Sequence, residues 1–142
     1  MTSLRQGIFA GLLAGFVQAA LYFFDYGPGN DLAGIARWLG LHSTDTERLL
    51  GFLMLIILGG VFGLLFGLLQ RGRVIALGRA LLLGVATGVV YWIVLVVLFG
   101  MVINHIGIDF GGFLYSFVPL LLYGMLLGAF YYSGSVKRAE YI

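Results

Sequence analysis

The sequence predicts an all-α integral membrane protein with four transmembrane helices, and three observations predict it. Of its 142 residues, 61% are hydrophobic and only 10% are charged, whereas soluble domains are about 45–50% apolar and about 25% charged. Four apolar runs each reach the roughly 20 residues that a spanning helix needs. Basic residues, finally, are concentrated beside particular ends of these runs. We therefore expect residues 1–142 to form a single transmembrane domain.

The four apolar runs are apolar on every side, whereas strands of a membrane barrel alternate polar and apolar residues. They predict transmembrane helices over residues 6–26, 48–70, 80–104 and 111–133. The first run is long for a signal-peptide core and ends in bulky aromatic residues, so we interpret it as a retained helix. A short helix over about 30–40 is also predicted, with apolar residues at helical spacing and Trp38 suited to a membrane interface.

The basic residues predict the orientation of the chain. If both termini are cytoplasmic, that side receives six basic residues and the outer side receives two: Arg5, Arg71, Arg73, Arg79, Lys137 and Arg138 against Arg37 and Arg48. Short loops rich in Lys and Arg stay in the cytoplasm. We therefore expect a multi-pass protein of the bacterial cytoplasmic (inner) membrane, with the short 30–40 helix on its outer surface.

The spacing of glycines indicates an internal repeat. Three glycines in or directly after the first span recur 73 positions later in the third, and two of the second recur 61 positions later in the fourth. They are Gly11, Gly15 and Gly27 with Gly84, Gly88 and Gly100, and Gly63 and Gly67 with Gly124 and Gly128. The interpretation that we favour is two tandem, similar helical hairpins. Chance matching among 23 glycines is the alternative.

The same glycines predict how the helices pack. They recur every four residues, which places them on one helix face and lets two backbones approach closely in lipid. The helix-packing candidates are Gly11, Gly15, Gly59, Gly63, Gly67, Gly84, Gly88, Gly124 and Gly128. We expect most of these faces to meet within the chain, and contact with another subunit is the alternative.

Catalytic chemistry finds little support in the sequence. The central part of every span lacks Asp, Glu, Lys, Arg and His, the groups that pumps and coupled transporters place there. No motif of phosphate binding, serine hydrolysis or metalloprotease chemistry occurs. The chain is therefore predicted not to be an enzyme. The intramembrane polar candidates are Gln18, Thr87, Tyr91 and Ser116, with Tyr123, and they serve either interhelical hydrogen bonds or a bound ligand.

Two histidines are the weak candidates for binding a cofactor. His42 and His105 both fall on the predicted outer side, and Asp109 follows His105 at a distance suited to orienting an imidazole. No other ligand type accompanies them, and the chain has no cysteine. We therefore expect no metal site and no cofactor, and keep a haem- or pigment-binding subunit as a further alternative.

Four segments carry a resemblance to a known family. They are RQGIFAGLLAG at 5–15, WLG at 38–40, GGVFGLLFGLL at 59–69 and LYGMLLGAFYY at 122–132. In these segments the chain resembles the uncharacterised bacterial four-helix membrane proteins related to YagU. The resemblance implies the same four-helix architecture and carries no catalytic residue with it.

These features lead to one expected function and one main alternative. The expected function is a non-catalytic accessory subunit of a larger bacterial membrane protein complex, of the respiratory or photosynthetic kind. Its partners are then the lipid bilayer and other membrane subunits, and no nucleic acid. The alternative is a homo-oligomeric channel or small-solute transporter, in which Gln18, Thr87, Tyr91 and Ser116 face a pore shared between copies.

Overall fold

A computed structural model describes residues 3–24, 44–71, 76–103, 107 and 109–140 of the chain. Its helices are α1 (Ser3–Phe24), α3 (Thr44–Gln70), α4 (Leu77–Trp92), the π-helix η1 (Ile93–Ile103) and α5 (Phe110–Glu140). Because η1 continues α4 without a break, the two form one rod. The described residues contain four helices long and apolar enough to cross a membrane, and no strand.

Two helices extend furthest beyond the bounds that the apolar runs predict. Helix α3 begins at Thr44 rather than at 48, and α5 continues to Glu140 rather than ending at 133. Hydropathy reports the part of a helix that lies in hydrocarbon, whereas the helix ends where its backbone hydrogen bonds end. The extra turns of α5 are packed: a Cβ added to Gly134 would lie 2.8 Å from the Gln6 amide nitrogen of α1. The predicted short helix at 30–40 lies outside the described residues.

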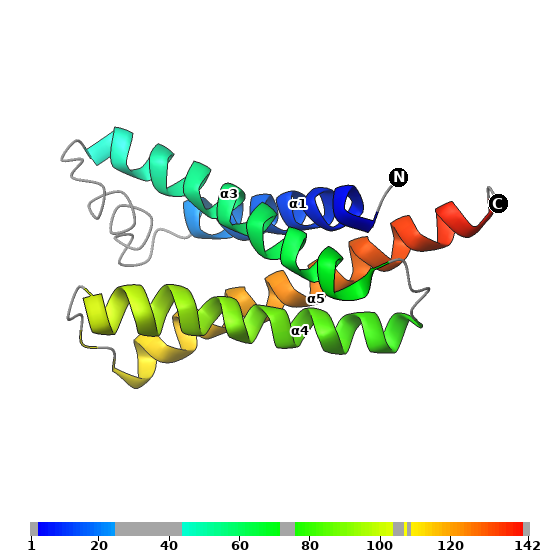
Figure 1. The fold of residues 1–142 in the computed structure, drawn as a ribbon. Helices are drawn as coiled ribbons and strands as arrows, with labels where there is room; N and C mark the ends of the chain where they lie inside the picture. Colours follow the sequence, from blue (N-terminus) through cyan, green and yellow to red (C-terminus); the bar gives the residue numbers. More distant parts are fainter. Residues whose placement is uncertain (1–2, 25–43, 72–75, 104–106, 108, 141–142) are drawn as a thin grey trace.

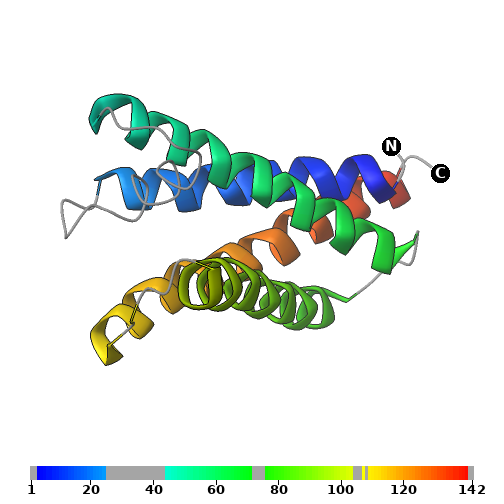
Figure 2. The same ribbon diagram turned by 60° about the vertical axis from the view of Figure 1, so that its left-hand side comes forward.

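The helices associate as two antiparallel pairs, α1 with α3 and α4 with α5 (Figure 1). The second view shows the second pair below the first, with α5 approaching α1 at the end of the molecule where both termini lie (Figure 2). Helices α1 and α5 make most of the contact between the pairs, and α3 touches α4 only sparsely. We call the α1–α3 unit the first pair and the α4–α5 unit the second pair.

Glycines of α1 and α3 bring the backbones of the first pair together. A Cβ added to Gly59 would lie 2.7 Å from the Gly11 carbonyl oxygen and 2.8 Å from the Gly15 Cα. A Cβ on Gly63 would lie 2.6 Å from the Gly11 Cα. Only a residue without a side chain permits this approach, which places many atoms at van der Waals distance where lipid supplies no hydrophobic drive.

The second pair uses the same device. A Cβ on Gly84 would lie 2.9 Å from the backbone nitrogen of Gly128, and one on Gly88 would lie 3.2 Å from the Gly124 Cα. Gly128 also faces the backbone of Ala80. The close approach in both pairs is therefore between main chains of the same molecule.

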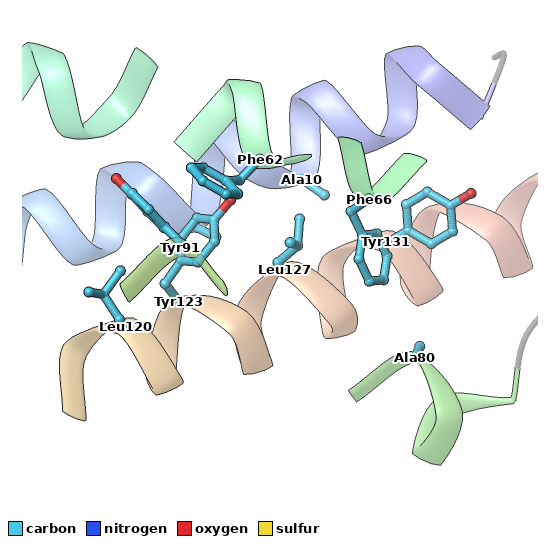
Figure 3. Close-up of a cluster of buried hydrophobic side chains, with 10 residues drawn as sticks. Ala10, Phe62, Phe66, Ala80, Tyr91, Leu120, Tyr123, Leu127 and Tyr131 are labelled. Atoms are coloured by element: carbon cyan, nitrogen blue, oxygen red, sulfur yellow. The ribbon is translucent and has the colours of Figure 1, made fainter. Parts of the chain in front are cut away.

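Neighbouring stripes on the same helices face the other pair. In α1 the buried positions Gln6, Ala10, Ala14 and Gln18 recur every four residues, beside the glycine stripe. Helices α3, α4 and α5 place large, buried aromatic side chains between the pairs: Phe62, Phe66, Tyr91, Tyr123 and Tyr131 (Figure 3). Small residues on α1 thus make room for bulky ones between the pairs.

The outward faces of all four helices carry large apolar side chains, among them Phe9, Ile57, Leu82 and Val118. In contrast, the basic side chains whose exposure the structure describes are all exposed and lie near the helix ends on the side of the termini: Arg5, Arg71, Arg79 and Lys137. Apolar side chains around the middle of the molecule and basic side chains at one end suit the hydrocarbon core of a bilayer and its headgroups.

Candidate functional site

The polar groups between the two helix pairs are the candidate functional site. Buried polar atoms are costly in a lipid-facing protein unless they are hydrogen-bonded. A buried polar group that is kept despite this free-energy cost is therefore a candidate for a structural or binding role. Three places with such groups are at Tyr123, at Gln6, and at Gln18 with Tyr91. Gln70 and Ser135 are also buried, and the Ser135 hydroxyl donates to the Tyr132 carbonyl of its own helix.

Tyr123 links the second pair to the first. It is fully buried, and its hydroxyl donates a hydrogen bond of 2.7 Å to the backbone carbonyl of Gly59 in α3. Gly59 exposes this carbonyl because it has no side chain, and the same residue also meets Gly11 and Gly15 of α1. One position of α3 thus serves both the crossing within the first pair and the contact between the pairs.

Gln6 makes a similar link near the termini. Its amide nitrogen donates a hydrogen bond to the backbone carbonyl of Tyr131 in α5. The other amide atom, Oε1, is buried and has no hydrogen-bond partner among the described residues. The Tyr131 ring meets Phe66 of α3 edge-on, with centroids 5.1 Å apart. Gln6 therefore ties α1 to α5 where α3 packs on the same tyrosine.

Gln18 and Tyr91 are buried without any such link. Gln18 is 1% exposed and Tyr91 is 0% exposed. In the part of the chain that the structure describes, neither the two amide atoms of Gln18 nor the Tyr91 hydroxyl has a hydrogen-bond partner. An unsatisfied buried polar group costs about 1–3 kcal/mol. Both residues come from the four intramembrane polar candidates.

Packing holds the Tyr91 ring in place. Its ring stacks on Phe62 of α3 with centroids 4.4 Å apart, and the Tyr123 ring meets it edge-on at 5.1 Å. In Figure 3 the Tyr91 hydroxyl points away from the Leu120 side chain and toward the ribbon of α1. A ring enclosed on two sides cannot swing its hydroxyl to another partner without disturbing both helix pairs.

The remaining polar candidates are satisfied locally. Thr87 donates a hydrogen bond of 2.9 Å to the Leu83 carbonyl of its own helix. Ser116 donates to the Phe113 carbonyl of its own helix at 3.1 Å and accepts a hydrogen bond of 3.0 Å from the indole nitrogen of Trp92. Both serine and threonine are only partly exposed. The Ser116 hydroxyl therefore contributes to the contact between α4 and α5, whereas the Thr87 hydroxyl is bonded only within α4.

The two histidine candidates, His42 and His105, lie outside the described residues. Within the described ranges, no three side chains of His, Cys, Asp or Glu come together as metal ligands do. Nothing about cofactor binding by His42 or His105 follows from either observation, so the haem- or pigment-binding alternative stays a prediction.

The nine glycine candidates all lie in the two helix crossings. Gly11, Gly15, Gly59, Gly63 and Gly67 belong to the first pair, and Gly84, Gly88, Gly124 and Gly128 belong to the second. Each faces a backbone of this chain rather than its outer surface, and each is buried.

Sequence reasoning missed Gln6 and the indole of Trp92 as bonding groups between helices. A signal for Gln6 exists, because Gln6, Ala10, Ala14 and Gln18 form a four-residue stripe beside the glycines. Two glutamines at the ends of a stripe of alanines indicate a buried face with polar contacts. Trp92 carried no such signal, since its partner Ser116 lies 24 residues away on another helix.

Comparison with protein-family models, with curated proteins and with solved structures finds no match to this chain. The class of protein therefore follows from the chain's own geometry: a helical protein with four spans long enough to cross a membrane and an uncharged polar interior.

Proposed function

We propose that this protein is a non-catalytic accessory subunit of a larger membrane protein complex, in the cytoplasmic membrane of a bacterium and with both termini in the cytoplasm. The single observation that carries the proposal is the exposure of the third span. Only 17% of the Leu77–Leu98 span is buried within the chain, against 33–39% of the other three. Among the described residues, the third span is thus the one that the rest of the chain covers least.

The exposed positions of α4 form a stripe along the helix. Leu82 is 72% exposed and Val90 is 52% exposed, and Ala86 lies between them at four-residue spacing. Gly84 and Gly88 of α4 point the opposite way, toward α5. A continuous apolar stripe of moderate width suits a neighbouring membrane helix as well as lipid. A protein whose role is packing against others needs such a surface.

The proposed orientation rests on charge. Four exposed basic side chains gather at the helix ends beside the termini, which is the side that stays in the cytoplasm under the positive-inside rule. The resemblance to the YagU-related proteins and the placement in a respiratory or photosynthetic assembly belong to the same proposal.

The proposed duplication is supported by the two helix crossings. Gly11 meets Gly63 in the first pair as Gly84 meets Gly124 in the second, and Gly15 meets Gly59 as Gly88 meets the Leu120 backbone. In each pair the first helix of a hairpin lays small residues on the backbone of the second. Equivalent crossings at equivalent positions are what tandem copies of one hairpin would retain.

A pore shared between copies of the chain has less support. Gln18 and Tyr91 are buried inside one molecule rather than on its outer surface, and the Thr87 hydroxyl is bonded to its own helix. A channel between subunits lined by these groups would require the helix pairs to separate first.

The test is extraction in a mild detergent, followed by native electrophoresis and mass spectrometry of every co-migrating protein. We expect the chain to migrate with larger membrane subunits. Migration as a lone four-helix monomer, with no partner, would contradict the proposal.

A pair of variants locates the contact. Leu82→Trp enlarges the exposed stripe of α4 and is expected to reduce recovery of the complex. Ile57→Trp, at an outward position of α3 that is 57% exposed, is the matched control and is expected to leave recovery unchanged. Equal recovery with both variants would place the contact elsewhere than on α4.

A further inference from the structure

The polar groups of Gln18 and Tyr91 are in one region of the molecule. Gln18 lies one helical turn beyond Ala14, which belongs to the buried cluster that contains Tyr91. Tyr22, one turn further along α1, shares a packed cluster with Leu95, one turn beyond Tyr91 in the α4–η1 rod. Gln18 is thus bracketed by two positions of α1 that face the Tyr91 region.

Between them these two residues supply three hydrogen-bonding atoms without partners among the described residues. The Gln18 amide offers a donor and an acceptor, and the Tyr91 hydroxyl offers both functions on one oxygen. The Tyr123 hydroxyl donates to the Gly59 carbonyl, and no group among the described residues, Tyr123 included, is a hydrogen-bond partner of the Tyr91 hydroxyl. Buried groups of this kind are normally satisfied by protein, by ordered water or by a bound molecule.

The helix carrying Tyr91 also changes its geometry at this point. The rod passes from α-helix to π-helix at Ile93, two residues after Tyr91. The Ile93 backbone nitrogen bonds to the carbonyls of Val89 and Val90, four and three residues before it.

We propose that Gln18 and Tyr91 form an intramembrane binding site for a small uncharged molecule whose oxygen both accepts and donates hydrogen bonds. Water is the smallest such molecule, and a neutral organic solute with a hydroxyl group is the other source of the same chemistry. The ligand is uncharged because no Asp, Glu, Lys, Arg or His occurs in the central part of any span to balance a charge. The site lies between α1 and α4 and does not depend on a partner subunit.

The test compares the full-length protein with Tyr91→Phe, Gln18→Leu and the double variant by thermal unfolding in detergent. If a molecule is bound, each single variant removes a hydrogen bond between the protein and that molecule, and Tm falls by about 2–4 °C. The double variant falls by less than the sum, because both residues hold the same molecule. Tyr132→Phe, at a half-buried tyrosine of α5, is the control and is expected to leave Tm unchanged.

A Tm that does not fall in the single variants overturns the proposal. If nothing binds, each single substitution removes an unsatisfied polar atom, so Tm rises or stays the same and the two effects add. Should Gln18→Leu fail to fold, Gln18→Met provides a flexible apolar replacement and gives the same comparison.

Mass spectrometry of a solvent extract of the purified protein separates the two sources. A neutral compound that is present in equal amount with the wild-type chain and absent from the double variant identifies an organic ligand. Coupled Tm changes without any such compound identify water.

Discussion

Single glycines determine how closely the helices approach, and substituting one glycine at a time tests this effect most directly. Gly63 and Gly60 are neighbours on α3 with different surroundings. A Cβ on Gly63 would meet the backbone of Gly7 and Gly11, whereas one on Gly60 would meet only the end of the Leu12 side chain. Backbone atoms of a packed helix cannot move aside, but a leucine side chain can rotate.

We expect Gly63→Ala to destabilise the protein by about 1–3 kcal/mol, the usual cost of overpacking. Gly60→Ala, the control, is expected to change stability by less than half as much. Reversible unfolding in mixed micelles, followed by circular dichroism, measures both. Equal effects of the two substitutions would show that the crossing is looser than the Gly63 contacts indicate.

At the scale of the helices, the contact between α4 and α5 away from the termini depends on Trp92. Its indole donates to Ser116, and its ring meets Phe113 and Phe117 edge-on at 5.1 and 5.4 Å. Both helices are irregular here, since the π-helix begins at Ile93 and Pro119 lies inside α5. A proline removes one backbone hydrogen bond, so side-chain contacts carry more of the cohesion of this segment.

Ser116→Ala removes the acceptor for the Trp92 indole and is expected to cost about 0.6–2 kcal/mol, the range for interhelical hydrogen bonds in membrane proteins. Hydrogen exchange of the α5 backbone near Phe117 should accelerate while exchange near Tyr131 stays the same. Thr87→Ala, whose hydroxyl bonds only within α4, is the matched control. Uniform acceleration along α5 would contradict a local role for the Trp92–Ser116 contact.

At the scale of the whole molecule, the four spans and the position of the termini make a topology that can be read by labelling. The chain has no cysteine of its own. Gly107 is exposed at the end of the molecule away from the termini, with no atom within 4 Å of an added Cβ. Lys137 is exposed in the last turns of α5, at the end that carries the termini.

In intact cells, a membrane-impermeant maleimide is expected to label Gly107→Cys and to label Lys137→Cys only after the membrane is opened. The charge distribution of the chain is the reason, because its basic end stays in the cytoplasm. The reverse pattern would invert the orientation. Labelling of both positions from the same side would contradict an odd number of crossings between them.

The sequence by itself determined the four apolar helices and the glycine stripes. Both depend on local properties, namely the length of an apolar run and the spacing of residues along one helix. The four-residue spacing of Gly7, Gly11 and Gly15 is visible before any partner is known.

Only the tertiary structure decided which helix each stripe faces and which polar groups are left unpaired. Thr87, Tyr91, Ser116 and Tyr123 look alike in the sequence, as polar residues within apolar runs. Their states differ because each depends on a residue far along the chain: Tyr123 reaches Gly59 across 64 positions, whereas nothing among the described residues reaches Tyr91. Hydrogen bonding between helices depends on the register of their packing, which no local pattern contains.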